Sequence, residues 1–270
     1  MSSPPQTRTR EEIVALLREH AREAAILLDI DGTLAPVVER ADEATVPSDT
    51  RRILAELSGR FALVACISGR QALQARRMVG LDTVTYVGNH GLERLAPHAG
   101  APLLEPGLEQ RAAQVRAFAR ARYDAAFEEA GIRLEDKDAI WAFHWRGVPD
   151  PERARALLAD VAAAAEAAGL VPHWGRMVLE LRPTAAVDKG TAVDRALAGS
   201  SVRIALFGGD DTTDLDAFRR IRELESAGDL DAAVCVGVAS TEGPPEIAAQ
   251  ADMVVTGPGE FRDLLARLAA

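Results

Sequence analysis

The sequence predicts an α/β protein with a doubly wound parallel sheet and a smaller α+β domain inserted into it. Short apolar runs, each followed by a turn signal, recur towards both ends of the chain, and helical stretches lie between several of them. Runs of this kind are typical of strands buried on both faces, and their alternation with helices indicates a parallel sheet. The middle of the chain has a different pattern, which occurs twice. A chain of 270 residues is long enough for two domains.

The chain opens with residues 1–10, which we expect to be disordered. Residues 11–24 follow as a predicted helix, because Ile13, Leu16 and Leu17 recur at helical spacing. The core strands are predicted at residues 24–30, 61–67, 83–88, 202–209, 232–238 and 252–257. This order assigns to the core the segments 1–92 and 183–270.

Residues 93–182 form the predicted inserted domain. Two long, Ala-rich and charged stretches, 107–130 and 150–169, are typical of helices with one exposed face, and each precedes two short strand candidates. The four candidates are residues 131–137, 139–146, 170–174 and 176–183. Two successive αββ units predict a four-stranded antiparallel sheet with two helices on one face.

Alternation along these strands separates an apolar face from a charged face. Trp141, Phe143 and Trp145 fall on one face, whereas His144 and Arg146 fall on the other. In the neighbouring strands, the same rule assigns to the charged face Arg133, Glu135, Lys137, Arg176, Glu180 and Arg182. Two interpretations fit this pattern equally: a solvated sheet face, which is ordinary for antiparallel sheets, and a polar lid over a polyhydroxylated ligand.

Composition excludes several classes of partner. The formal net charge of -10 and the lack of a basic run disfavour nucleic acid, because phosphate backbones are bound by clustered Lys and Arg. No segment approaches the roughly 20 apolar residues that span a bilayer, and the N-terminus has no apolar signal core. Cys66 and Cys235 lie inside apolar runs, as buried reduced thiols do. We therefore expect a cytoplasmic protein with neither a nucleic-acid nor a membrane partner.

Polar motifs follow three core strands at their carboxyl ends, which is where ligands bind in an open α/β sheet. They are Asp-Ile-Asp-Gly-Thr at 29–33, Ser-Gly-Arg at 68–70, and Gly-Gly-Asp-Asp-Thr-Thr-Asp at 208–214. Lys189 lies just before the helix that leads into the strand at 202–209. Each motif alone is ordinary, so it is their shared position that indicates a single site.

The two carboxylates of Asp29 and Asp31 lie so close that they need a compensating cation or proton. Carboxylates are the hard oxygen ligands that Mg²⁺ prefers, and Asp29, Asp210 and Asp214 supply them. We therefore predict a Mg²⁺ cofactor. With the cation shielding it, Asp29 can attack phosphorus as a nucleophile and form an aspartyl-phosphate. Asp31 would protonate the departing alkoxide and later deprotonate the water that hydrolyses the intermediate.

Three further residues complete the predicted core site. Ser68 and Lys189 would hydrogen-bond and neutralise the oxygens of the transferring phosphoryl group, which is the electrostatic work that phosphoryl transfer requires. Gly32 lets the chain turn sharply, so that backbone amides can face the phosphate.

These motifs, in this order, resemble the four motifs of the haloacid dehalogenase superfamily of phosphotransferases. The resemblance implies a Rossmann-like hydrolase core with an αββαββ cap domain. It also implies a metal held by Asp29, Asp210 and the backbone carbonyl of Asp31, with Asp214 behind these ligands. Phosphatases and mutases of the superfamily carry an acid at the position of Asp31, whereas the dehalogenase and ATPase branches lack one. The expected reaction is therefore phosphate ester hydrolysis.

Further segments are similar to the trehalose-6-phosphate phosphatase family, and the specific ones are YVGNHGLE, LEDKDAIWAFHWR and MVLELRP. The resemblance implies hydrolysis of trehalose 6-phosphate to trehalose and phosphate, the last step of trehalose biosynthesis. In the cap, the residues that it assigns to the disaccharide are Glu135, Lys137 and Glu180, followed by His144 and Arg146. On the core side, the residues that it assigns to the substrate are Thr33, Arg70, Asn89, His90 and Gly91.

Other functions stay open on the sequence alone. A phosphatase of the sucrose-phosphate type is the nearest alternative, and a sugar phosphomutase uses a similar Asp-x-Asp but returns the phosphoryl group to a sugar. A non-catalytic sugar-phosphate sensor would require a broken catalytic set, whereas Asp29, Asp31, Lys189 and Asp210 are all present. No synthase domain is visible in the sequence, so we expect any trehalose-phosphate synthase partner to be a separate protein.

Overall fold

The computed structural model describes residues 6–38, 44–104, 107–175, 177–183, 188–240 and 243–270. The chain forms two compact units, which we call the core unit and the cap unit. The core unit consists of Met1–Leu103 and Asp188–Ala270, and the cap unit of Leu104–Val187. Among the described residues, no helix is both long enough and apolar enough to cross a membrane.

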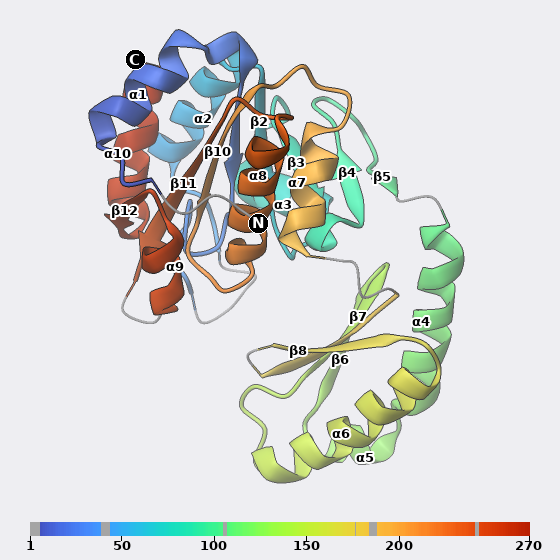
Figure 1. The fold of residues 1–270 in the computed structure, drawn as a ribbon. Helices are drawn as coiled ribbons and strands as arrows, with labels where there is room; N and C mark the ends of the chain where they lie inside the picture. The colour runs from blue at the N-terminus through green and yellow to red at the C-terminus, as the bar shows by residue number, and fades with distance from the viewer. Residues whose placement is uncertain (1–5, 39–43, 105–106, 176, 184–187, 241–242) are drawn as a thin grey trace. The chain divides into compact units, whose positions relative to one another are not determined.

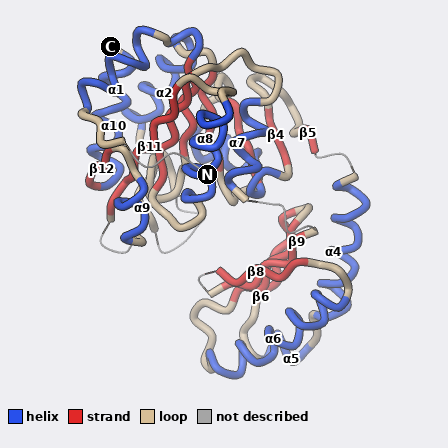
Figure 2. The backbone as a smooth tube through the Cα atoms, viewed as in Figure 1, coloured by secondary structure: helices blue, strands red, loops and turns tan. Residues whose placement is uncertain are grey.

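The core unit is built on one sheet, whose strands run in the order β12-β11-β10-β1-β2-β3-β4-β5 (Figures 1 and 2). The strands are β1 (Ala24–Leu28), β2 (Leu63–Ile67), β3 (Thr85–Gly88), β4 (Glu93–Leu95), β5 (Leu103–Leu104), β10 (Ile204–Gly209), β11 (Ala232–Ala239) and β12 (Met253–Thr256). All six predicted core strands form, and they pair in parallel. The predicted α/β fold with a parallel sheet is therefore confirmed.

Helices cover both faces of this sheet, as continuous apolar strands require. In β1, Ala24, Ile26 and Leu28 pack into one apolar cluster, while Ala25 and Leu27 pack into another on the opposite face. The helices that contribute to the first cluster are α1 (Arg10–Glu19), α2 (Ser48–Arg60), α3 (Ala72–Val79) and α10 (Gly257–Ala269). Those that contribute to the second are α7 (Lys189–Leu197), α8 (Asp214–Ala227) and α9 (Pro245–Gln250).

The N-terminal segment differs from its prediction. Residues 1–5 lie outside the described residues, but the next ones are ordered against Asp252. The backbone amide of Gln6 donates to Asp252 Oδ1 over 2.6 Å, and that of Arg8 donates to the Asp252 carbonyl over 3.0 Å. Thr9 then caps α1, so the prediction of disorder was wrong for residues 6–10. The helix also ends before residue 24, because a short 3₁₀ turn (Ala21–Glu23) leads directly into β1.

The cap unit contains the predicted four-stranded antiparallel sheet, in the order β6-β7-β9-β8. Its strands are β6 (Arg133–Lys137), β7 (Ile140–His144), β8 (Val171–Gly175) and β9 (Val178–Arg182), and its helices are α4 (Leu108–Arg122), α5 (Ala125–Glu129) and α6 (Pro151–Ala167). The predicted helix over 107–130 is interrupted because Asp124 caps α5 instead of continuing α4, accepting the Ala126 amide over 2.9 Å. Apolar side chains of the helices and of one sheet face form a single cluster.

The inserted unit begins later than residue 93. Glu93–Leu95 forms β4, which pairs antiparallel with β3, in the register Gly88 with Glu93. A 3₁₀ turn over Asn89–Gly91 folds the chain back onto β3, and this return keeps residues up to Leu103 in the core unit. A three-residue strand is too short for its alternation to be recognised in the sequence.

Candidate active site

Three motifs meet at the carboxyl edge of the core sheet because their strands are direct neighbours. β1 pairs with β10 on one side and with β2 on the other, and all three run in parallel. Asp29 follows β1, Ser68 follows β2 and Asp210 follows β10. Parallel neighbours place their carboxyl ends side by side, so the predicted convergence of these motifs occurs.

Lys189 connects two carboxylates of this site. Its Nζ lies 2.6 Å from Asp29 Oδ1 and 2.6 Å from Asp214 Oδ1, and the three side chains are buried. Burial alone lowers the pKa of the Lys189 ammonium, but the charges of Asp214 and Asp29 outweigh it and raise that pKa. Lys189 therefore stays charged and provides a fixed cation inside the site.

The backbone of the motif after β10 is held by Asp214. Its Oδ2 accepts the backbone amides of Asp210 and Asp211, each over 3.0 Å, while Oδ1 accepts from Lys189. Asp214 thus makes three contacts with the protein itself. This arrangement fits a residue that shapes the site from behind rather than one whose oxygens face a ligand.

Negative charge is in excess in this part of the core unit. Carboxylate oxygens of Asp29, Asp210 and Asp214 all lie within 4.8 Å of one another, and all three residues are buried. Burial, followed by the charge of Asp214, raises the pKa of Asp210 to about 6. Burial also raises the pKa of Asp29, and Lys189 only partly opposes this effect. A hard divalent cation fits such a set of oxygens, and it would relieve their repulsion.

The turn after β1 leaves no room for a side chain at Gly32. Its φ is 92°, and a Cβ atom built there would lie 2.0 Å from Asp210 Oδ2. Thr33, whose side chain is buried, donates from Oγ1 to Asp210 Oδ1 over 3.0 Å. The glycine therefore lets the first motif approach the third, and Thr33 connects them.

Asp31 and Arg70 form a bidentate ion pair. Nε of Arg70 donates to Asp31 Oδ2 and Nη2 donates to Oδ1, each over 2.7 Å. The Arg70 amide also donates to the hydroxyl oxygen of Ser68 over 3.1 Å. Asp31 is the more exposed of the first two aspartates, since 36% of its side chain is accessible against 6% for Asp29.

The segment after β3 contacts the loop after β2. The amides of Asn89 and His90 donate to the carbonyls of Arg70 and Ser68, over 2.8 and 3.2 Å, and both residues have positive φ. Glu93, which was not predicted as a site residue, is buried and connects these segments. Its Oε1 accepts the Ala72 amide over 2.6 Å and the Asn89 side-chain amide over 3.4 Å. A glutamate directly after an apolar residue in GNHGLE gives no signal that it turns inwards.

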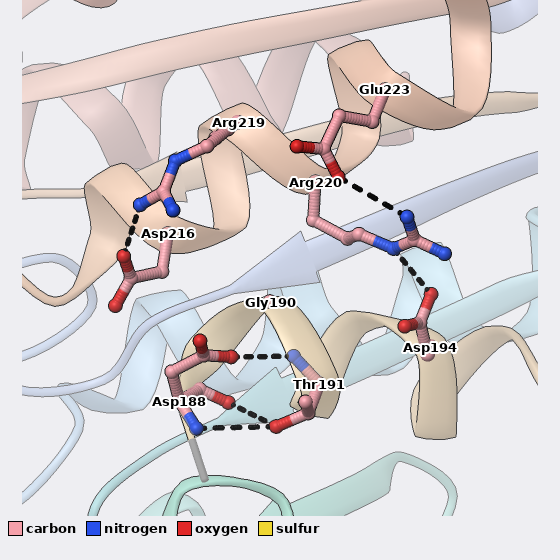
Figure 3. Close-up of a pocket in the computed structure, with 8 residues that line it drawn as sticks. All are labelled: Asp188, Gly190, Thr191, Asp194, Asp216, Arg219, Arg220 and Glu223. Carbon is pink, nitrogen blue, oxygen red and sulfur yellow. Dashed lines mark hydrogen bonds and ion pairs between the residues drawn. The ribbon is translucent and has the colours of Figure 1, made fainter. Parts of the chain in front are cut away.

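Helix α7, which begins at Lys189, is fixed at its start and along its side (Figure 3). Asp188 caps it by accepting the Thr191 amide on Oδ1 over 2.8 Å. Further along, Arg220 of α8 pairs with Asp194 of α7 over 2.8 Å. Gly190 allows the close approach of the two helices, because a Cβ there would lie 3.2 Å from the Asp216 carbonyl oxygen. These contacts hold the base of the Lys189 side chain in place.

A second polar cluster lies on the charged face of the cap sheet. Lys137 Nζ is 2.9 Å from Glu180 Oε1 and 4.0 Å from Glu135 Oε2. His144 Nε2 lies 2.7 Å from Glu135 Oε2; this hydrogen bond, together with Lys137, lowers the pKa of Glu135. Arg182, which was not singled out as a site residue, donates to Glu180 Oε2 over 2.8 Å.

The predicted division of the cap strands into an apolar and a charged face is therefore correct. Trp141, Phe143, Leu179 and Leu181 pack into the apolar cluster of the cap unit. Arg146 does not join the charged cluster; it lies exposed in the turn beyond β7. Arg176 lies outside the described residues.

Sequence comparison relates this chain to phosphatases of trehalose metabolism. The model of the trehalose-phosphatase family matches residues 27–253. A trehalose-phosphate phosphatase of Mycobacterium marinum is 33% identical over 205 residues, which are 72% of this chain and 50% of that protein. An uncharacterized glycosyl hydrolase of Mycobacterium tuberculosis is 38% identical over 214 residues, 74% of this chain and 15% of that protein. The chain thus spans about half the length of these relatives, or less.

Solved structures show the same fold. The C-terminal domain of the Candida albicans trehalose-6-phosphate phosphatase has a TM-score of 0.75 at 20% identity, with 98% of both chains covered. A haloacid dehalogenase-like hydrolase from Bacteroides thetaiotaomicron has a TM-score of 0.62 at 16% identity, covering 90% of this chain and 98% of that chain. At these identities, the likeness concerns the architecture.

Proposed function

This chain belongs to the trehalose-phosphatase family, and we propose that it hydrolyses trehalose 6-phosphate to trehalose and phosphate, the last step of trehalose biosynthesis. One observation carries the proposal: a chain matched by that family over residues 27–253 also holds Asp29, Lys189 and the acidic loop after β10 in direct contact at one sheet edge. A trehalose-phosphate synthase would supply the substrate.

The reaction begins at Asp29. Lys189 holds Oδ1, so Oδ2 is the oxygen that attacks phosphorus. A bond forms between Oδ2 and phosphorus while the bond from phosphorus to the sugar oxygen breaks, and Asp31 protonates the departing alkoxide. In the second step, water attacks phosphorus, Asp31 removes its proton, and Asp29 is released.

The charge of the transferring phosphoryl group is stabilised by Lys189 and Ser68. The Ser68 hydroxyl oxygen accepts the Arg70 amide, so its own O–H can donate to a phosphoryl oxygen. Preorganised donors of this kind cost no reorganisation during the reaction.

Mg²⁺ fits the oxygen set of the core unit. Asp29 and Asp210 would hold it through side-chain oxygens and Asp31 through its carbonyl, while Asp214 keeps the loop in shape. When bound, the ion would neutralise charge on the phosphate oxygens and on Asp29. The raised pKa of Asp210 is consistent with this assignment, because burial and the charge of Asp214 both disfavour its carboxylate form, and a bound cation would favour it.

The residues that we propose as sugar contacts form two groups, one within each unit. In the cap unit, Glu135, Lys137, Glu180 and His144 form one connected cluster, and Arg146 stands apart from it. In the core unit, the proposed contacts are Thr33, Arg70, Asn89, His90 and Gly91. Charged groups that hydrogen-bond to hydroxyls give the orientation and selectivity that a disaccharide needs.

Phosphate release from a panel of sugar phosphates tests the proposal. The panel holds the phosphates of trehalose, sucrose, glucose and mannose, each with Mg²⁺, with EDTA, and with Asp29→Asn. We expect trehalose 6-phosphate to be turned over best, and only by the wild type with Mg²⁺. Preference for sucrose phosphate would contradict the proposed substrate but would leave the proposed hydrolysis mechanism unchanged. Transfer to a sugar without free phosphate would indicate a phosphomutase.

A further inference from the structure

The charged face of the cap sheet has an alanine at its centre. Ala142 on β7 pairs with Glu135 on β6 and with Glu180 on β9. Residues that pair directly across antiparallel strands point to the same face, so the Ala142 methyl lies between the two glutamates. Ala142 is fully buried, yet it is absent from the apolar cluster that holds its neighbours Trp141 and Phe143. It is therefore part of the floor of the charged face.

The space above this floor is used by Lys137. Neighbouring strands lie about 4.8 Å apart, so the backbones of Glu135 and Glu180 are separated by roughly 10 Å. The Lys137 ammonium bridges this separation, 2.9 Å from Glu180 and 4.0 Å from Glu135. A larger side chain at position 142 would rise between the glutamates and compete with the ammonium for that space.

We propose that Ala142 is a specificity-determining residue, whose small size lets Glu135, Lys137 and Glu180 converge into one polar site for sugar hydroxyls. This inference rests on the proposed function, because it assumes that this face binds the sugar part of a sugar phosphate. Hydroxyl groups both donate and accept, and two carboxylates with one ammonium offer both kinds of partner. The size of residue 142 therefore acts on sugar binding, whereas the groups that cleave the ester lie in the core unit.

The test compares wild type with Ala142→Leu, Ala142→Val and Ala142→Ser on two substrates. One is the sugar phosphate that the wild type hydrolyses best, and the other is p-nitrophenyl phosphate, which has no sugar. Ala163→Leu adds the same bulk at an exposed position of α6 and serves as the matched control.

We expect Ala142→Leu to raise KM for the sugar phosphate by about tenfold or more, the factor for a lost charge-assisted hydrogen bond. Ala142→Val raises it less, and Ala142→Ser keeps the wild-type value because a hydroxyl group is small. For p-nitrophenyl phosphate, kcat/KM stays at the wild-type value in all variants, as do both activities of Ala163→Leu.

A wild-type KM for the sugar phosphate in Ala142→Leu would overturn the inference, and so would an equal loss with both substrates. If the leucine variant fails to fold, the same two outcomes in Ala142→Val decide. A best substrate other than trehalose 6-phosphate refutes the proposed function but leaves this comparison valid with that substrate. If the wild type hydrolyses no sugar phosphate, the proposed function and the proposed role of Ala142 are both refuted.

Discussion

Arg70 donates to both carboxylate oxygens of Asp31, over 2.7 Å in each case, and the two residues are 39 positions apart in the chain. Two parallel hydrogen bonds fix the plane of the carboxylate as well as its position. Asp31 is the proposed proton carrier, so Arg70 orients the carboxylate that would exchange a proton with the leaving group and with water.

Replacement of Arg70 by lysine tests this role. Lysine keeps the charge but cannot bind both oxygens in one plane. We expect steady-state assays to show kcat/KM reduced by roughly tenfold to a hundredfold, as for one or two lost charge-assisted hydrogen bonds. Arg77→Lys, on the exposed side of α3, is the matched control and should behave as wild type. An Arg70→Lys enzyme with full activity would show that the bidentate geometry is unimportant.

The sequence predicts the carboxyl-edge cluster correctly but not this pairing. Asp29, Ser68 and Asp210 follow neighbouring parallel strands, and parallel pairing alone brings them together. The contact from Arg70 to Asp31, like that from Glu93 to Ala72, depends on how loops turn and on side-chain rotamers. No spacing rule encodes those.

The same distinction applies to the fold. Long apolar runs identified every strand of the parallel part, because burial on both faces leaves a continuous signal. β4 is short, and the break at Asp124 depends on whether a carboxylate caps a new helix or stays exposed within a longer one. Both are decided by tertiary contacts.

Lys189 should stabilise the folded state, because its ammonium touches two buried carboxylates. Lys189→Met leaves Asp29 and Asp214 without that cation, so we expect the free energy of unfolding to fall by about 3–5 kcal/mol without metal. Urea denaturation measures this loss, and added Mg²⁺ should recover part of it. Lys137→Met, in the partly exposed cluster of the cap unit, is the matched control and should lower the free energy of unfolding by less. Equal losses in the two variants would show that the buried position of Lys189 adds no stability beyond that of an ordinary ion pair.

Binding of Mg²⁺ should depend on pH through Asp210. The pKa of Asp210 is about 6 in the metal-free folded protein, raised from 3.8. Between about pH 4 and pH 6, Asp210 is therefore protonated in the folded state but deprotonated in the unfolded state. This group therefore makes the metal-free fold less stable as pH rises from about 4 to about 6, and Mg²⁺ gains affinity as the proton leaves. Calorimetric titration should show Kd rising by up to about tenfold per pH unit below pH 6.

Asp210→Asn supplies the control for that titration. It carries no proton to displace, so its weaker binding should lose the part of the pH dependence that Asp210 causes. Affinity for Mg²⁺ that stays constant in the wild type between pH 5 and pH 7 would contradict the assignment of Asp210 as a ligand.

Glu93 should stabilise the segments after β2 and β3, because its carboxylate accepts hydrogen bonds from Ala72 and Asn89. Glu93→Ala removes the acceptor of the buried Ala72 amide, so we expect a loss of about 1–3 kcal/mol in unfolding free energy and lower kcat/KM. Glu93→Gln keeps an oxygen acceptor and should recover most of both quantities. Glu56→Ala, at an exposed position of α2, gives the background value. If the glutamine variant is as damaged as the alanine variant, the charge of Glu93 matters and not its acceptor oxygen.

The most direct test of Asp29 as the nucleophile is the stereochemical course at phosphorus. It is measured with a sugar phosphorothioate that carries two oxygen isotopes and is hydrolysed in water of the third isotope, so that the released thiophosphate is chiral. Attack by Asp29 followed by attack of water consists of two in-line displacements, so we expect overall retention of configuration. Inversion would mean that water attacks the substrate directly, and it would contradict the role of Asp29 as nucleophile.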